Sequence, residues 1–99
     1  MRHFTYILKS LKDSRRYIGS SSSLLARINA HNAGLTTATR NRRPLTLLCV
    51  KEFDSYKEAQ QYERYLKKLK GGNQLYKEIE QMKNNAVVAQ LVEQLHGKE

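Results

Sequence analysis

Arg27 and His31 are the first pair of side chains in this sequence whose types and spacing could do chemistry. They stand four residues apart in a segment that predicts a helix, so they lie one turn apart and side by side. Leu24 and Ile28 form the apolar face of this helix, and the pair lies on its flank. Such a pair could bind one phosphate together, although similar pairs are common at solvated helix edges.

Glu63 is the main inconsistency between this sequence and the structure that its pattern predicts. In a second predicted helix it lies within an apolar stripe formed by Ala59, Tyr62, Leu66 and Leu69. A carboxylate on the core-facing side costs free energy unless it is paired or bound to a cation. Glu63 therefore requires an arginine, a lysine or a metal ion, and an ordinary salt bridge at the helix edge is the simpler alternative.

Tyr6 and Tyr17 are two further candidates, each in a segment that predicts a strand. Tyr6 shares a strand face with Phe4 and Leu8, and Tyr17 shares one with Gly19. Tyrosines in strands are mostly core residues with a tethered hydroxyl, so neither is strong evidence for chemistry alone.

The elements that must position these side chains follow from periodicity and turn signals. The pattern predicts a β-hairpin, a helix, a buried strand and two more helices, an α+β fold in the order β-β-α-β-α-α with a small antiparallel or mixed three-stranded sheet. The expected helix starts have serine caps, one in the run Ser20–Ser23 and one at Ser55, and Gly34 closes the first helix. The expected segments are 4–8, 16–19, 24–33, 45–53, 55–70 and 74–83.

Charge is distributed unevenly along the chain. The net charge is +9, and residues 1–51 hold ten Lys and Arg against one acid, Asp13. Such a field attracts a polyanion, which makes nucleic acid the leading partner. A solvated basic surface or a ribosome-associated protein are the alternatives that charge alone leaves open.

Length and composition limit the remaining possibilities. The 99 residues allow one domain, predicted over 1–83, with 84–99 as a C-terminal extension that is helical or disordered. No apolar run is long enough for a membrane span or a signal peptide, so we expect a cytoplasmic protein without membrane contact. The single cysteine, Cys49, lies in an apolar run and is predicted to be buried.

Five ordered motifs make the chain, from about residue 2 to residue 80, resemble the small single-domain members of the GIY-YIG nuclease family. They are Phe4-Thr5-Tyr6, Tyr17-Ile18-Gly19, the helix segment 25–32, the basic loop 39–44 and the glutamate helix segment 58–68. The sequence departs from the family pattern in two places. Phe4 and Thr5 replace the glycine and isoleucine of the first motif, and Ala38 stands where the small members usually have a tyrosine.

The resemblance implies metal-dependent hydrolysis of phosphodiester bonds in DNA. By it, Glu63 holds Mg²⁺ or Mn²⁺, Arg27 binds the scissile phosphate, and Tyr6 or Tyr17 orients or deprotonates the attacking water. A tyrosine needs a cation or a base nearby to act at neutral pH, and His31 could be that base. The sequence does not decide which of Tyr6, Tyr17 and His31 accepts the proton.

The expected partner is DNA, bound either non-specifically or according to its structure, through a further basic set. That set is Arg40, Arg42, Arg43 and Lys67. A protein partner or a homodimer is compatible with so small a domain. The rival interpretation is a non-catalytic nucleic-acid-binding module of the same fold, and the altered first motif and Ala38 favour it.

Overall fold

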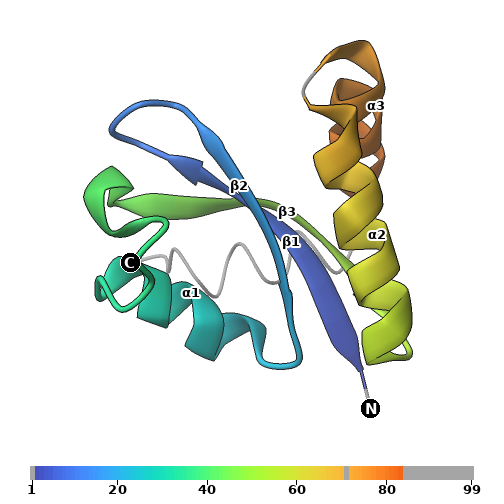
Figure 1. Ribbon diagram of the computed structural model, residues 1–99, viewed down its shortest axis with the longest axis horizontal. Coiled ribbons are helices and arrows are strands. Elements are labelled where there is room, and N and C mark those ends of the chain that lie inside the picture. Colours follow the sequence, from blue (N-terminus) through green and yellow to red (C-terminus); the bar gives the residue numbers. More distant parts are fainter. Residues whose placement is uncertain (1, 71, 84–99) are drawn as a thin grey trace.

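The structure is a computed structural model that describes residues 2–70 and 72–83. It confirms the α+β fold and the predicted order of strands and helices, and it adds a short 3₁₀ turn, η1, before the third strand (Figure 1). The elements are β1 (His3–Ser10), β2 (Arg16–Ser21), α1 (Leu24–Asn32), η1 (Arg40–Arg42), β3 (Leu45–Phe53), α2 (Tyr56–Leu69) and α3 (Gly72–Lys83).

The three strands form one antiparallel sheet in the order β2-β1-β3, so β1 is central and β2 is an edge. Side chains alternate between the two faces of β1. One face of the sheet is covered by α1, and the other by α2 and α3 (Figure 1). Tyr6 and Leu8 point to the α1 face, whereas Thr5 and Ile7 point to the α2 and α3 face.

Each face of the sheet has its own core. The buried residues on the α1 face are Tyr6, Leu8, Leu24, Ile28, Leu45, Leu47 and Val50. Those on the α2 and α3 face are Ile7, Cys49, Leu66, Leu75, Ile79 and Met82. Cys49 is fully buried, as predicted, and burial raises the pKa of its thiol to about 12.

Helix starts differ from the prediction in one respect that matters for the site. Ser55 caps α2 as predicted, accepting a hydrogen bond from the backbone N–H of Glu58 at 3.2 Å. The serine run before α1 behaves differently, because β2 extends through Ser20 and Ser21, and Ser23 precedes α1 without a side-chain cap. Ser20 is thereby free to face α2.

One prediction concerns a part of the chain that the structure does not test. Residues 84–99 lie outside the described residues, so the division at residue 83 stays a prediction. No helix within the described ranges has the length and apolarity to cross a membrane.

Candidate functional site

The Tyr6 hydroxyl lies in the core under α1, where polar groups must find partners. The residue is 1% exposed, and its hydroxyl oxygen is 3.3 Å from Nε2 of His31. Gly19 lies directly across the strand pair from it. A Cβ at Gly19 would lie 2.7 Å from the Tyr6 oxygen, so only glycine leaves room for this ring.

His31 is fully buried and is held on three sides. Its Nδ1 lies 2.7 Å from Oγ1 of the buried Thr39, its Nε2 faces Tyr6, and its ring meets that of Tyr17 edge to face at 4.9 Å. Burial and the nearby Arg27 charge lower the pKa of His31, which favours a neutral ring with one donor and one acceptor nitrogen.

Burial corrects one expectation about His31. A ring without exposed surface cannot share a phosphate with Arg27, as the helix spacing had indicated. It stands behind Tyr6 instead, where it can take a proton from the hydroxyl.

Arg27 is exposed, and both Tyr6 and Tyr17 act to raise the pKa of its guanidinium. Side-chain hydrogen bonding with Tyr6 is the largest of the causes that raise the pKa of Arg27. Burial raises the pKa of Tyr6 above its ordinary value, and Arg27 partly opposes this shift. A permanently charged guanidinium and a buried, protonated phenol therefore act on each other's pKa.

Glu63 approaches this group from the other face of the sheet, past the edge strand. Its side chain is 19% exposed, and Oε1 accepts a hydrogen bond from the Ser20 hydroxyl at 2.7 Å. Its charge also contributes, as the smallest of five causes, to the raised pKa of Tyr6. Sequence reasoning missed Ser20, because a serine run before a helix predicts caps.

Lys67 supplies the partner that Glu63 requires. Its Nζ donates to Oε2 of Glu63 at 2.7 Å, one helical turn away. The simpler alternative, a glutamate in a salt bridge, therefore describes this conformation. Lys67, predicted to bind DNA, pairs with this carboxylate in the structure, and its contact with DNA stays a prediction.

A metal ion at Glu63 would have few protein ligands. No cluster of three or more His, Cys, Asp or Glu suited to a metal occurs within residues 2–70 and 72–83. Mg²⁺ is commonly held by one or two carboxylates with water and substrate oxygens completing the shell. One half-buried carboxylate with a hydroxyl beside it fits that mode, provided that Lys67 moves aside.

The basic loop does not present its arginines as one surface. Arg42 turns to the β1–β2 turn, where Nε lies 3.6 Å from Asp13 and a terminal nitrogen donates to the Arg16 carbonyl at 3.2 Å. Arg40 and Arg43 are exposed and lie on the side of the loop near the end of α1. Arg42 is thus paired within the domain in this structure, and its predicted contact with DNA stays a prediction.

Comparisons with known proteins agree with this architecture. The family model of the GIY-YIG catalytic domain matches residues 2–77. UPF0213 protein YazA of Bacillus subtilis is 38% identical over 85 residues, which cover 84% of this chain and 83% of YazA. UPF0213 protein CPE1444 of Clostridium perfringens is 43% identical over 68 residues, covering 68% of this chain and 72% of that protein.

A solved structure is also similar. The solution NMR structure of UPF0213 protein BH0048 from Bacillus halodurans aligns with a TM-score of 0.50 at 27% identity, covering 91% of this chain and 94% of that one. The names of these relatives state no activity, whereas the family model describes a catalytic domain. The chain therefore belongs to the GIY-YIG family of nuclease domains.

Proposed function

We propose that this protein is a divalent-metal-dependent endonuclease that hydrolyses phosphodiester bonds in DNA, in processing of the repair or recombination type. One observation carries the proposal. The Tyr6 hydroxyl lies 3.3 Å from Nε2 of the buried His31, and the exposed guanidinium of Arg27 lowers the pKa of the same hydroxyl against the effect of burial. A phenol between a base and a cation is suited to proton transfer beside an anionic phosphate.

In the proposed reaction, water attacks phosphorus, the bond to the leaving oxygen breaks, and that oxygen takes up a proton from solvent. The water gives up its proton through the tyrosine hydroxyls that face Arg27, and His31 takes the proton of Tyr6 at Nε2. Thr39 fixes the His31 ring, which makes Thr39 a positioning residue. Arg27 binds the phosphate oxygens and stabilises their developing charge.

Glu63 is the proposed ligand of Mg²⁺ or Mn²⁺, with Ser20 orienting its carboxylate. Such an ion, when bound, supplies charge stabilisation at the phosphate and the leaving oxygen. The surplus of positive charge supports DNA as the substrate, and binding should fall steeply with salt. A protein partner or a second copy could add affinity to so small a domain.

The test is cleavage of labelled single-stranded, duplex and flap DNA at low salt, in Mg²⁺, Mn²⁺ or EDTA. Glu63→Gln is compared with Glu78→Gln, because Glu78 also accepts a hydrogen bond from a hydroxyl, that of Tyr62. We expect cleavage by the wild type and by Glu78→Gln, and none by Glu63→Gln or in EDTA. Equal cleavage by both variants would refute the metal role of Glu63.

A second candidate is a nucleic-acid-binding module that does not cut. The Lys67–Glu63 ion pair favours it, because the lysine takes one oxygen of the carboxylate that a metal would need. In that case wild type and Glu63→Gln would both bind DNA equally and neither would cleave any substrate.

A further inference from the structure

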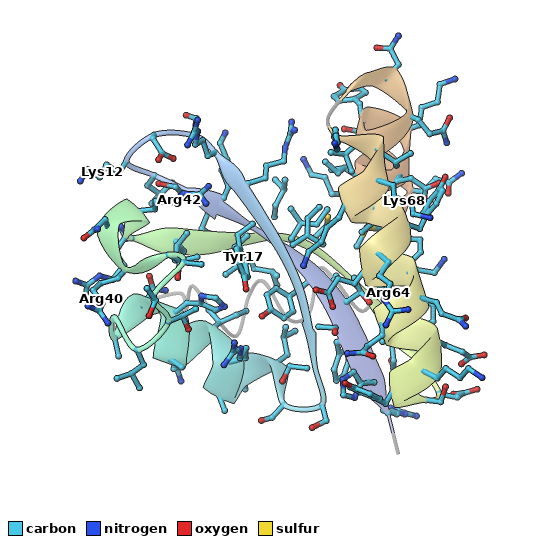
Figure 2. The ribbon with its side chains drawn as sticks, in the orientation of Figure 1. Lys12, Tyr17, Arg40, Arg42, Arg64 and Lys68 are labelled. Carbon is cyan, nitrogen blue, oxygen red and sulfur yellow. The ribbon has the colours of Figure 1, made fainter. Side chains whose placement is uncertain are left out.

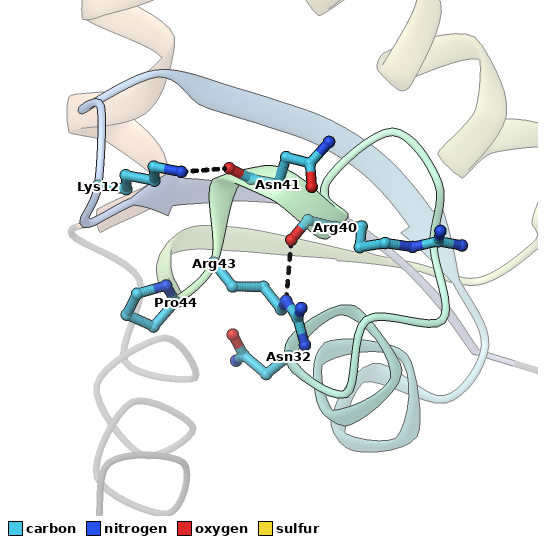
Figure 3. Close-up of a pocket in the computed structure, with 6 residues that line it drawn as sticks. All are labelled: Lys12, Asn32, Arg40, Asn41, Arg43 and Pro44. Carbon is cyan, nitrogen blue, oxygen red and sulfur yellow. Dashed lines mark hydrogen bonds between the residues drawn. The ribbon is translucent and has the colours of Figure 1, made fainter.

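A basic depression lies where the C-terminal end of α1, the loop after it and the β1–β2 turn meet (Figure 3). Its volume is about 500 Å³, which is ample for a phosphate with its neighbouring sugars. It is lined by Lys12, Asn32, Arg40, Asn41, Arg43 and Pro44. Lys12 comes from the hairpin turn, a part of the chain that the basic loop motif does not include.

The three cations of the depression are each anchored through one nitrogen to a backbone carbonyl of the same loop. Arg43 Nε donates to the Arg40 carbonyl at 2.8 Å, and Lys12 Nζ donates to the Asn41 carbonyl at 3.2 Å (Figure 3). Arg40 Nε donates to the Gly34 carbonyl at 3.2 Å. Each arginine has four further N–H donors on its terminal nitrogens, so the anchors fix the side chains while leaving donors for a ligand.

Two other residues give this depression its shape. Gly34 has φ +82°, and a Cβ there would lie 2.7 Å from a terminal nitrogen of Arg43, so glycine both permits the turn and leaves room for the guanidinium. The Asn32 side-chain amide donates to the carbonyl of Leu45 at 3.0 Å and accepts from its N–H at 2.8 Å. These two bonds tie the end of α1 to the start of β3, beside Pro44.

Charge in the depression favours an anion. None of the six described residues that line it is acidic, and Asp13, next to Lys12 in sequence, is engaged by the Arg15 N–H and by Arg42. The C-terminal end of α1 contributes roughly −0.5 of a charge, against three full positive charges. The balance remains clearly positive.

The depression also lies at a useful distance from Arg27. Asn32 is five residues beyond Arg27 on α1, about 7.5 Å along the helix axis. Successive phosphates of one strand advance by about 3.4 Å along a duplex axis. A strand whose phosphate contacts Arg27 would bring a flanking phosphate to the depression within a few nucleotides.

We propose that Lys12, Arg40 and Arg43 form a site for a phosphate of the DNA strand that flanks the position contacted by Arg27. The inference rests on the proposed function for its ligand, and it names Lys12 as a DNA contact while excluding Arg42. The site sets where the strand lies relative to Arg27. The phosphate is either an internal phosphodiester or a 5′-terminal phosphate, and both present the same oxygens.

The test measures DNA binding rather than cleavage, by fluorescence anisotropy of labelled oligonucleotides with the full-length Glu63→Gln protein and no added metal. In that background, Arg40→Gln/Arg43→Gln is compared with Arg64→Gln/Lys68→Gln. The control pair removes the same charge from exposed positions on α2, away from the depression (Figure 2). Lys12→Gln is a third variant that removes neither loop arginine, and circular dichroism establishes that each variant is folded.

We expect the Arg40/Arg43 pair to lower affinity about tenfold or more and to reduce the salt slope by about two, one for each lost phosphate contact. The control pair should lower affinity less than about threefold. The loss of affinity in Lys12→Gln should lie between that of the Arg40/Arg43 pair and that of the control pair. Oligonucleotides with a 5′-phosphate or a 5′-hydroxyl distinguish the two kinds of phosphate. Tighter binding of the 5′-phosphate form that is lost in the Arg40/Arg43 double variant identifies a terminal phosphate. Equal binding of the two forms identifies an internal one.

A loss of affinity in the Arg40/Arg43 pair no larger than in the control pair would overturn the site, even if the wild type cleaves DNA. Conversely, a selective loss of binding would uphold the site even if the wild type cleaves nothing, and only the nuclease proposal would then fail.

Discussion

The two faces of the sheet are built from one set of strands, yet they bury different chemistry. On the α2 and α3 face the buried cluster is apolar, with Leu66 and Ile79 packed against Ile7 of β1. On the α1 face the preceding residue of β1, Tyr6, brings a hydroxyl into the core, where it lies 3.3 Å from His31. Strand alternation alone separates the two roles, because neighbours in β1 face opposite ways.

The two faces are therefore stabilised in different ways, and the proposed catalytic groups Tyr6 and His31 lie on the α1 face. An apolar cluster stabilises through the area that it removes from water and tolerates no cavities. A buried polar group instead depends on its hydrogen-bond partners, and the loss of one partner leaves the other unsatisfied. The faces should therefore respond differently to substitution.

The largest expected effect is on the apolar face. Leu66 is fully buried there, so Leu66→Ala should lower the free energy of unfolding by about 2–5 kcal/mol. Thermal unfolding monitored by circular dichroism measures it, with about 4–8 °C per kcal/mol expected for a domain of this size. Tyr76→Ala, at a position 60% exposed on α3, is the control and should change stability little. Equal losses would contradict the assignment of the core.

A smaller effect is expected from the two buried threonines, one on each face. Thr39→Val leaves Nδ1 of His31 without its partner and should lower the free energy of unfolding by about 1–3 kcal/mol. Thr5→Val removes a donor from the Ala59 carbonyl, which lies within α2 and can keep its helical hydrogen bond, so it should cost less. Urea denaturation of both variants measures these two losses of stability. A larger loss for Thr5→Val than for Thr39→Val would be evidence against the Thr39–His31–Tyr6 network.

The pH dependence of stability should come from the α1 face. The pKa of His31 is below its ordinary value of 6.5 because of burial and Arg27. Between the folded and the unfolded pKa the unfolded chain binds more protons, so stability is full above about pH 6.5 and is lost as pH falls below it. One proton can contribute at most about 1.4 kcal/mol per pH unit.

Urea midpoints of the wild type and of His31→Gln between pH 7.5 and pH 5 measure this effect. The wild type should lose more stability than the variant over that range, because only the wild type has His31 to protonate. Subtracting the variant's curve removes the contribution of the other titrating groups. Parallel curves would mean that His31 is not held neutral.

The smallest effect on stability is expected from the Lys67–Glu63 ion pair, beside the edge strand β2. Lys67 is largely exposed, so removing its ion pair with Glu63 through Lys67→Gln should change stability by less than about 0.5 kcal/mol. Calorimetry of that variant against wild type checks this, and a loss above 2 kcal/mol would show that the pair is a structural requirement rather than a surface contact.

The sequence predicted the elements well because each has a local signal. Alternation marks β1, and a serine cap with an amphipathic stripe marks α2 and singles out Glu63. Ser20 and Thr39 carry no such signal. Ser20 acts only because β2 runs on to Ser21 and faces α2, and Thr39 is buried by an irregular loop that folds back onto His31.

The directions of side chains were also not predictable from the sequence. Arg40, Arg42 and Arg43 are near neighbours along the chain, yet the η1 turn sends Arg42 to Asp13 and leaves its neighbours at the depression beside α1. The spacing of Arg27 and His31 correctly made them neighbours, but periodicity could not show that one is exposed and the other buried.

If the Tyr6 hydroxyl on the α1 face takes part in phosphodiester cleavage, as proposed, two variants that each remove a single oxygen atom should differ in activity. Tyr6→Phe removes the hydroxyl beside His31, and Tyr62→Phe removes one from the other face, where it donates to Glu78 at 2.6 Å. The measurement is the initial rate of DNA cleavage in Mn²⁺ by each folded variant. A fall of about 100-fold or more for Tyr6→Phe, with Tyr62→Phe close to wild type, is the predicted result. Equal rates for the two variants would contradict the claim.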